Sequence, residues 1–228
     1  AAKGFKAAGI HCGIRKNKSK KDLALIFSEN KANAAAVYTT NLVKGAPIAV
    51  TKRHLENGVA QAVICNSGNA NTCNAKGVEI AEQMSALIAD ALSISNDDIV
   101  VASTGVIGQP LDITPIKEGI PKLINALGSN SVDAANAIMT TDTALKEVAV
   151  SFEIGGVECK IGGIAKGSGM IHPDMATMLV FITTDCAISS KMLQKALSAD
   201  IKDTFNMVSV DGDTSTNDMV TVMANGMA

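Results

Sequence analysis

Thr177 stands at a junction where a threonine hydroxyl could act as a nucleophile. Residues 162–177 are rich in glycine and polar side chains, and the chain then continues as the apolar run 178–182. A run of this length between turn-forming residues is typical of a strand that is buried on both faces. Thr177 is therefore expected where a loop becomes a core strand, directly after the small residue Ala176.

The hydroxyl of Thr177 is a weak nucleophile and needs a base. Self-cleavage would supply one, because attack on the carbonyl of Ala176 breaks the chain and leaves Thr177 with a free α-amino group. Such amines titrate near pH ~8, which suits a general base, and N-terminal threonines are a known nucleophile–base combination. A loop that leads into a core strand needs no such chemistry, so the spacing alone leaves both interpretations open.

Two other segments carry groups that could serve the same reaction. Thr104 and Gly105 close an expected buried strand, where a hydroxyl and a backbone N–H can both face one cavity. Lys166 lies 11 positions before Thr177 on a glycine-flanked loop that could fold back over it. On sequence grounds alone this lysine is better explained as a solvated loop residue, since most lysines are solvated.

Several cofactor and metal sites are excluded by spacing. The lysine of the glycine-rich segment 166–169 precedes its glycine, which is the wrong order for a phosphate-binding P-loop, and no GxGxxG is present. The segment 211–222 begins like a calcium loop but has Thr216 and Val222 where glycine and glutamate are required. His172 has no other histidine near it in the sequence, so we expect no metal and no cofactor.

Hydrophobic periodicity places these residues in an α/β protein. It predicts an amphipathic helix at 78–93 and a hairpin turn at Gly155–Gly156. The expected strands are 23–28, 34–40, 46–50, 60–65, 98–104, 147–154, 157–165, 178–183 and 207–210, and further helices are expected to begin at Thr114, at Ser131 and at Ser189 or Ser190, the last running to Thr204. The basic residues between 15 and 21 are expected in a solvated hairpin loop. The sheet should be mixed, with helices layered outside it.

The composition is that of a soluble, cytoplasmic protein. The 228 residues are 47% hydrophobic with a mean hydropathy of +0.23, so a sizeable core can form. A net charge of −2 and an aromatic content of 3% argue against nucleic-acid binding. No run approaches the ~18 apolar residues of a membrane span. The five scattered cysteines favour reduced thiols over disulfides or metal ligands.

Six segments in order along the chain resemble the ornithine acetyltransferase family, the glutamate N-acetyltransferases of arginine biosynthesis. They are AVYTTNLVKGAP (36–47), AVICNSGNANTC (62–73), STGVIGQPL (103–111), IMTTDT (138–143), the self-processing segment around MATML (175–179) and VDGDTSTND (210–218). Six ordered matches over nearly the whole chain make the resemblance specific.

The resemblance implies a fold and a reaction. The fold would be a layered α/β sandwich of mixed sheets with outer helices, similar to N-terminal-nucleophile enzymes. Cleavage at Ala176–Thr177 would give an α-chain portion, 1–176, and the start of a β-chain portion, 177–228, which assemble as a heterotetramer of two α and two β chains. A ping-pong reaction would then move acetyl from N-acetylornithine to glutamate, and some members of the family also accept acetyl-CoA.

The resemblance also assigns roles by position. Thr177 would be the nucleophile, Thr104 and Gly105 the oxyanion hole, and Lys166 and Thr143 the substrate-binding residues, with Thr140 and Thr141 as rivals to Thr143. A self-cleaving aminopeptidase or amide hydrolase remains an alternative, since water could replace glutamate. A catalytically silent fragment is another, because the family's chains continue far beyond residue 228.

Overall fold

The protein is built on one mixed β-sheet. A computed structural model describes residues 1–170 and 178–228. The strand order is β4-β3-β2-β8-β7-β6-β5, with β1 also paired to β2. The pairs β3–β4 and β7–β8 are parallel and the other neighbours are antiparallel. The strands are β1 Phe5–Ile10, β2 Leu23–Tyr38, β3 Val59–Asn66, β4 Ile99–Ser103, β5 Lys146–Ile154, β6 Val157–Lys166, β7 Leu179–Thr184 and β8 Met219–Ala224.

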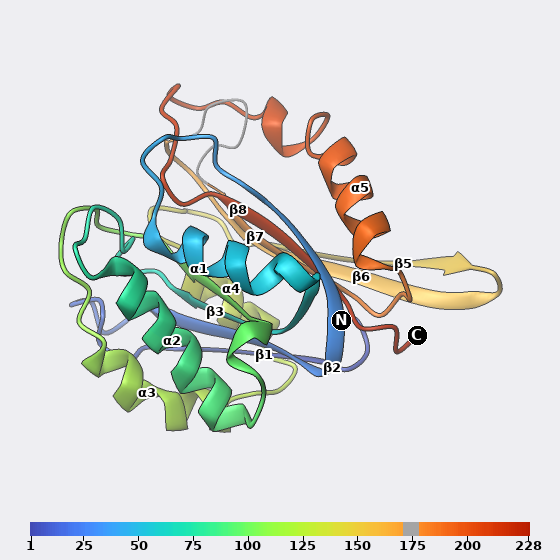
Figure 1. Ribbon diagram of the computed structural model, residues 1–228, viewed down its shortest axis with the longest axis horizontal. Coiled ribbons are helices and arrows are strands. Elements are labelled where there is room, and N and C mark those ends of the chain that lie inside the picture. The colour runs from blue at the N-terminus through green and yellow to red at the C-terminus, as the bar shows by residue number, and fades with distance from the viewer. Residues whose placement is uncertain (171–177) are drawn as a thin grey trace.

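Strand β2 joins two halves of this sheet. The sequence predicted two strands here, but a single strand of 16 residues forms and curves through the molecule (Figure 1). Its first part pairs with β1 and β3, and its second part pairs with β8. The register with β3 shifts between Phe27 and Ala32. Such irregularities bend a strand and increase its twist, which lets one strand serve two half-sheets.

Alternating side chains assign each face of the half-sheets to a layer. On β3, Val63 and Cys65 point into an inner core that also contains Phe181 of β7 and Met219 of β8. The intervening Ile64 packs with helices α2 and α3 on the outside. On the other half-sheet, β7 and β8 pack outward against α5. Because strand side chains alternate with a period of two, the buried strands of both half-sheets need apolar residues throughout.

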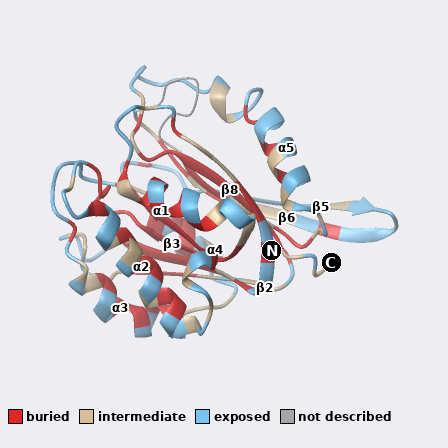
Figure 2. Cartoon of the chain, in the orientation of Figure 1, coloured by how far each residue is buried: buried red, intermediate tan, exposed pale blue. Residues whose placement is uncertain are grey.

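The result is the layered sandwich expected from the sequence. Helices α2 and α3 cover one outer face and α5 the other (Figure 1), and the strands between them are buried (Figure 2). The helices are α1 Ala46–His54, α2 Gly77–Leu92, α3 Thr114–Asn125, α4 Ser131–Ile138 and α5 Ser190–Asp200, with short 3-10 turns at Leu55–Asn57, Asn96–Asp98 and Phe205–Met207.

Two expected strands are wrong. Residues 46–50 begin helix α1, in which the buried residues Pro47, Val50, Thr51 and His54 recur at helical spacing. Pro47 suits the first turn of a helix because its fixed φ is helical and its missing N–H has no partner there. Residues 207–210 are exposed and lie outside any strand, because no neighbouring strand pairs with them, and α5 ends at Asp200 rather than at Thr204.

The expected hairpin is confirmed. Strands β5 and β6 pair from Lys146–Ala165 to Ile154–Val157, and Gly155 and Gly156 both have positive φ, +61° and +81°. A two-residue turn of this kind needs two left-handed residues, which glycine adopts without steric cost. Helix α2 also lies within one residue of its predicted bounds.

Candidate active site

A cavity of about 1000 Å³ opens where β3, β4 and β6 end. Five segments line it, and they include the loop 13–20, the residues after β3 and β4, residues 140–141, and the end of β6. Three of the predicted residues, Thr104, Gly105 and Lys166, meet on its wall. Ala176 and Thr177 lie outside the described residues.

Thr104 and Gly105 directly follow the buried strand β4. The N–H of Thr104 donates to the carbonyl of Asn66 at 2.9 Å, which fixes the backbone at the end of the strand. No hydrogen bond links the Gly105 N–H to any part of the chain that the structure describes. The Thr104 hydroxyl and the Gly105 N–H are therefore the two donors that this turn can offer to a ligand.

Position 105 requires glycine. Its φ is +128°, a conformation that side chains with a Cβ rarely adopt. A Cβ here would also lie 2.6 Å from the carbonyl carbon of Gly68. The close approach of these two turns is what brings the ends of β3 and β4 to one cavity wall.

Lys166 is a buried cation at the end of β6. Its side chain contacts Thr104, with Nζ donating to Oγ1 over 3.4 Å, and only 3% of the residue is exposed. Burial lowers the pKa of Lys166, and the charges of Asp142, Cys65 and Asp218 partly oppose that shift. Because the lysine donates to the Thr104 oxygen, the hydroxyl proton of Thr104 is left for another acceptor.

Strand pairing also relates Lys166 to the expected nucleophile. Lys166 is the register partner of Leu179 in the β6–β7 ladder. Leu179 follows Thr177 by two residues in the sequence. Residues 167–178 therefore connect Lys166 of β6 to Leu179 of β7, which are paired at the cavity end of the sheet.

Asp142 joins the segment 140–143 to the end of β6. Its carboxylate accepts the N–H of Gly167 at 2.7 Å, the N–H of Thr140 at 3.1 Å and the Nζ of Lys146 at 2.8 Å. Burial by itself would raise the pKa of Asp142, but these hydrogen bonds and the charge of Lys166 lower it overall. The sequence analysis missed this residue, although an acid inside a run of threonines was a signal for it.

The threonines of this segment divide between cavity and solvent. Thr140 and Thr141 line the cavity, and the Thr141 hydroxyl shares a 2.5 Å hydrogen bond with Ser168. Thr143, the predicted substrate-binding residue, is exposed and does not line the cavity. Among the described residues, the geometry thus favours the two rivals over Thr143 for contact with a bound molecule.

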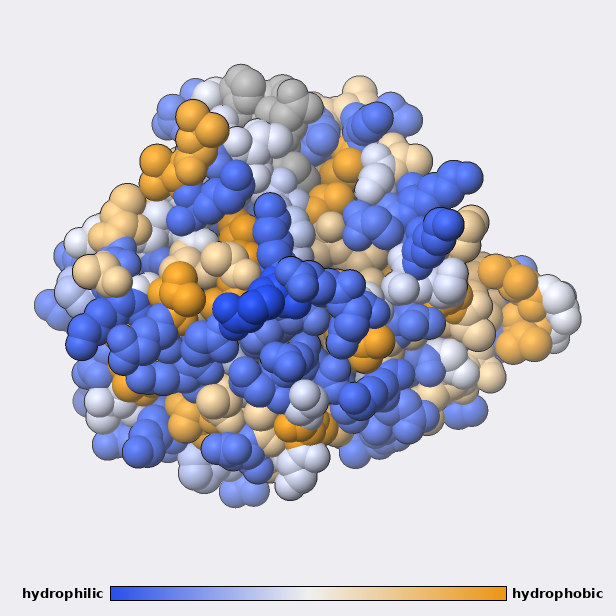
Figure 3. Space-filling model, viewed as in Figure 1, coloured by the Kyte–Doolittle hydropathy of each residue, from blue (hydrophilic) through white to orange (hydrophobic). Residues whose placement is uncertain are grey.

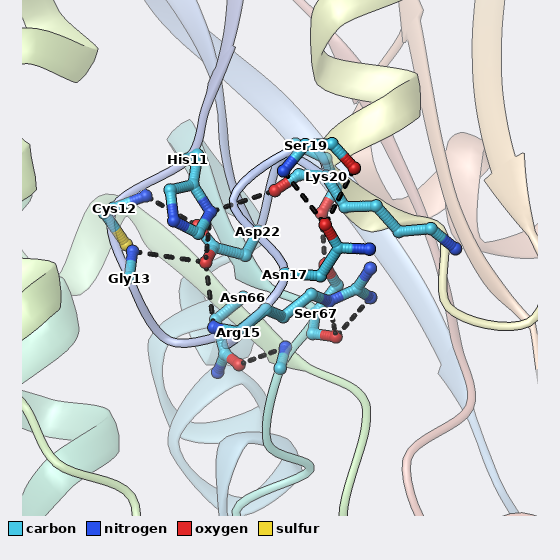
Figure 4. Close-up of polar contacts among 12 residues, drawn as sticks. His11, Cys12, Gly13, Arg15, Asn17, Ser19, Lys20, Asp22, Asn66 and Ser67 are labelled. Atoms are coloured by element: carbon cyan, nitrogen blue, oxygen red, sulfur yellow. Dashed lines mark hydrogen bonds and ion pairs between the residues drawn. The ribbon is translucent and has the colours of Figure 1, made fainter.

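The basic segment after β1 is a hairpin loop between β1 and β2 whose residues 16–20 are exposed, as predicted, and it folds along one side of the cavity. Asp22 is fully buried and accepts the backbone N–H groups of Cys12, Gly13 and Arg15 at 2.7, 3.2 and 2.9 Å (Figure 4). The Arg15 guanidinium donates to the carbonyl of Ser67 at 2.9 Å through Nε and also reaches the carbonyl of Met139.

This folding makes the cavity cationic. Arg15, Lys16 and Lys20 line it together with Lys166, whereas Asp112 is the one carboxylate among its described lining residues. Burial lowers the pKa of Arg15 and the nearby Asp22 opposes this shift, so the guanidinium keeps its charge in the wall. A cavity with this charge suits a ligand that carries carboxylates.

Asn217 ties the cavity wall to the start of β8. Its Nδ2 donates to the carbonyls of Ala70 and Ser103 at 2.6 and 2.9 Å, and its Oδ1 accepts the hydroxyl of Thr72 at 2.6 Å. The residue is 6% exposed. One amide thereby connects the loops after β3 and β4 with the segment that precedes β8.

A match to a family model decides which family the chain belongs to. Residues 6–228 match the model of the ArgJ family. The chain belongs to the ArgJ family. It is 51% identical over 228 residues to the "Arginine biosynthesis bifunctional protein ArgJ" of Caldanaerobacter subterraneus subsp. tengcongensis, covering 99% of this chain and 56% of that protein. The chain thus spans a little over half the length of this curated ArgJ relative.

Solved structures of the ArgJ family share the fold. The crystal structure of the Bacillus halodurans ArgJ protein has a TM-score of 0.72 and 40% identity, covering 78% of this chain and 92% of that one. The Mycobacterium tuberculosis ornithine acetyltransferase complexed with ornithine has a TM-score of 0.67 and 31% identity, covering 78% and 94%. An aminopeptidase of Ochrobactrum anthropi described as a variant of the Ntn-hydrolase fold matches at a TM-score of 0.61 and 16% identity, which shows likeness of fold alone.

Metal and membrane features complete the description. Across residues 1–170 and 178–228, no cluster of three or more His, Cys, Asp or Glu side chains could hold a metal ion. His172 lies outside those residues. The helices within the same two ranges are too short or too polar to span a membrane.

Proposed function

We propose that this chain carries the nucleophile and oxyanion hole of an ornithine acetyltransferase, which moves acetyl from N-acetylornithine to glutamate through an acetyl-Thr177 intermediate. One observation carries the proposal: Thr104, Gly105 and Lys166 converge on a cationic cavity at the strand ends, where Lys166 pairs with Leu179, which follows Thr177 by two residues in the sequence. Membership of the ArgJ family and the ornithine in a relative's crystal structure support the substrate class.

Cleavage between Ala176 and Thr177 would come first and would divide the chain into 1–176 and 177–228. The Thr177 oxygen attacks the Ala176 carbonyl, and the C–N bond breaks to give an ester and a free α-amino group. Water then hydrolyses this ester, which releases the Thr177 hydroxyl and leaves Ala176 with a terminal carboxylate. Coverage of the solved relatives supports such a division. In each match to a solved relative, 78% of this chain aligns with 92% or 94% of the solved chain, so the solved chains are shorter than 228 residues. The curated relative is much longer, because this chain covers only 56% of it.

Acetyl transfer would then use Thr177 twice. Its hydroxyl attacks the acetyl carbonyl of N-acetylornithine while its own α-amine takes the hydroxyl proton. The negative charge that develops on the carbonyl oxygen is held by the Thr104 hydroxyl and the Gly105 N–H. Collapse expels ornithine, which takes the proton, and the amino group of glutamate attacks the acetyl ester in the same way to give N-acetylglutamate and free Thr177.

The cations of the cavity would hold the amino-acid part of each substrate. Lys166 is buried beside Thr104, so its charge lies near the carboxylate of a molecule whose acetyl group contacts Thr104. Thr140 or Thr141, which line the same cavity, would add a hydroxyl in place of Thr143. The remaining length of the relatives would complete the site, and assembly into a heterotetramer of two α and two β pieces would follow cleavage.

The first test is the intact mass of the purified chain extended to the full length of its relatives. Two pieces, with the second beginning at Thr177, are expected from the wild type and one piece from Thr177→Ala. Two pieces from Thr177→Ala would show cleavage by another protease and contradict the proposal.

The second test separates the transferase from an amide hydrolase of the same fold. N-acetylornithine is supplied with and without glutamate, and N-acetylglutamate and free acetate are measured. Acetyl transfer that depends on glutamate is expected, and release of acetate at the same rate without glutamate would favour the hydrolase. Replacing N-acetylornithine by acetyl-CoA in the same assay shows whether a thioester donor is also accepted.

A further inference from the structure

Two of the five cysteines face each other across the β6–β7 ladder. The pairing of β6 with β7 reaches Ile161 and Thr184. One position further, the N–H of Asp185 donates to the carbonyl of Lys160 at 3.2 Å, and the N–H of Lys160 donates to the Asp185 carboxylate at 2.6 Å. The next pair of opposed residues is Cys159 and Cys186.

The geometry at this position suits a disulfide. The backbone bond from Asp185 to Lys160 extends the register by one residue, and a further step would place Cys159 opposite Cys186 at a position without ladder hydrogen bonds, where opposed Cα atoms approach to about 4.5 Å. Disulfides need Cα atoms about 4.4–6.8 Å apart. Burial and the neighbouring Cys186 thiol both raise the pKa of Cys159, so the two side chains lie close together.

The surroundings hold both residues in place. Asp185 is buried, and its carboxylate also accepts the N–H of Lys3 at 2.8 Å. The Thr184 hydroxyl donates to the Lys160 carbonyl at 2.8 Å and accepts the N–H of Cys186 at 3.2 Å. The strand ends that carry the two thiols are therefore fixed by side chains as well as by the ladder.

We propose that Cys159 and Cys186 form a disulfide when the protein meets a low-molecular-weight disulfide such as oxidised glutathione, and that this bond tethers the two halves of the chain. Both thiols are reduced in the present structure. The second part of the proposal rests on the proposed cleavage, because Cys159 lies before Ala176–Thr177 and Cys186 after it. The first part is independent of it.

The order of the two steps follows from exposure. Cys186 is half-buried, whereas Cys159 is 3% exposed, so Cys186 meets the oxidant first. Its thiolate attacks one sulfur of glutathione disulfide and expels one glutathione thiolate. The Cys159 sulfur then attacks the Cys186 sulfur of the mixed disulfide and expels the second. Two protein thiols are oxidised, one glutathione disulfide is reduced to two thiols, and the two protein protons go to the departing glutathiones.

The other three cysteines provide internal controls. Cys12 and Cys65 are held as thiols, since burial raises the pKa of each to about 12. Cys73 is exposed and has no partner thiol among the described residues. Glutathione disulfide should therefore leave a mixed adduct on Cys73 but an internal bond at Cys159 and Cys186.

Peptide mapping after oxidation tests the bond itself. The folded chain is incubated with oxidised glutathione, its remaining thiols are alkylated after denaturation, and the linked peptides are identified. We expect a Cys159–Cys186 link in the wild type and in Cys73→Ser. Cys159→Ser should keep a glutathione adduct on Cys186, and Cys186→Ser should leave Cys159 unmodified. Two results would overturn the proposal. One is that Cys159 and Cys186 are both alkylated, and so remained thiols, under conditions in which glutathione fully modifies Cys73. The other is a lasting glutathione adduct on Cys186 of the wild type while Cys159 remains a free thiol.

Electrophoresis of the same samples tests the tether. Oxidised, cleaved protein should migrate as one species without reductant and as two after reduction. Thr177→Ala should show the same mapped link in a single chain under both conditions, so the disulfide is judged even if cleavage does not occur. Two species from the oxidised, cleaved wild type without reductant would exclude the tether.

Discussion

The turn after β4 and the β5–β6 hairpin are both glycine-containing turns, but they are held in opposite ways. At Thr104–Gly105 the turn is fixed by the backbone carbonyl at the end of β3 and by buried side chains at the end of β6 and just before β8. The hairpin projects from the body of the molecule (Figures 1 and 2). On β5, every residue from Lys146 up to Phe152 is exposed, and Phe152 itself is partly covered. Its structure depends on its own turn and ladder.

Hydropathy sharpens the contrast. The exposed hairpin carries Val148, Val150, Ile154 and Val157 on one face, and hydrophobic side chains gather there in Figure 3. The cavity wall includes the buried polar residue Thr104, and two further buried polar residues, Asn66 and Asn217, lie behind it and hold the ends of β3 and β4. A polar side chain in the wall has structural partners on several elements, whereas an apolar one on the hairpin has few. Substitutions should therefore be costly in the wall and nearly neutral on the hairpin.

The largest effect is expected from Gly105→Ala. The added Cβ meets the Gly68 carbonyl carbon at 2.6 Å in a conformation with φ of +128°, so the turn must move. Acetyl transfer should fall by at least ~1000-fold, since both the backbone donor and the Thr104 hydroxyl shift. Gly155→Ala on the hairpin, which also has positive φ but open space around it, is the control. Equal activity losses in the two variants would contradict the contrast.

Asn217→Ala should cost the next largest amount. The change removes the amide donor of the buried Ser103 carbonyl and the shorter of the two hydrogen bonds to the Ala70 carbonyl, and each unsatisfied group costs about 1–3 kcal/mol. We expect a loss of about 3 kcal/mol in the free energy of unfolding, measured by urea denaturation. Asn136→Ala, whose exposed amide bonds only within its own helix, should lose less than about 0.5 kcal/mol. A loss for Asn217→Ala as small as that of the control would refute the role of this amide.

Thr104→Ala should act on catalysis more than on folding. Removing one oxyanion donor lowers kcat by ~100-fold or more, while Thr104→Ser, which keeps a hydroxyl, should stay within ~10-fold of the wild type. Steady-state kinetics of the full-length enzyme check both. A change confined to KM would make Thr104 a substrate-binding residue instead.

Lys166 gives the wall a pH dependence. Its folded pKa lies below the ordinary value because it is buried, so between these two pKa values the unfolded chain binds more protons than the folded one. Stability contributed by Lys166 should therefore rise with pH through this alkaline window. Over the same pH window Lys166 becomes neutral and binds a carboxylate more weakly, so KM for N-acetylornithine should rise.

A matched variant isolates this titration. In Lys166→Met both trends should be absent, and the difference in unfolding free energy between the two proteins is followed by denaturation at successive pH values. A difference that falls as pH rises would show the opposite shift. Lys160→Met, on the exposed side of the same strand, should behave like the wild type.

Val150→Ser on the hairpin should have the smallest effect. Val150 is 55% exposed, so little buried apolar surface is lost, and the unfolding free energy should change by less than about 0.5 kcal/mol. Acetyl transfer should be unchanged. A loss comparable with that of Asn217→Ala would mean that the hairpin face is covered in the working protein.

These two regions also show what could be predicted from the sequence. The hairpin follows from Gly155–Gly156 and the alternating residues around it, all within 20 positions, so local patterns sufficed. The same patterns misplaced residues 46–50, because a short apolar segment fits a strand or a helix until its buried face is known. The sequence patterns also predicted two strands where the single strand β2 forms, because the charged residues at its register shift resemble a turn.

The wall could be predicted only in part. Thr104, Gly105 and Lys166 were named through likeness to a family, and they do line one cavity. The contacts of Asn217 with Ala70 and Ser103 span 147 and 114 positions, so no local signal reports them. The cationic role of Arg15 depends on a loop that Asp22 folds inward, and Thr143 was chosen over Thr140 and Thr141 without knowledge of which side of the segment faces the cavity.

The most direct test is to trap the proposed intermediate on Thr177. The full-length enzyme is mixed with N-acetylornithine in the absence of glutamate, quenched in acid, and its peptides are analysed by mass spectrometry. One acetyl group should appear on the fragment that begins at Thr177, and it should disappear when glutamate is added before the quench. Turnover of N-acetylornithine with no acetyl group on Thr177, or with the acetyl group on another residue, would contradict the central claim.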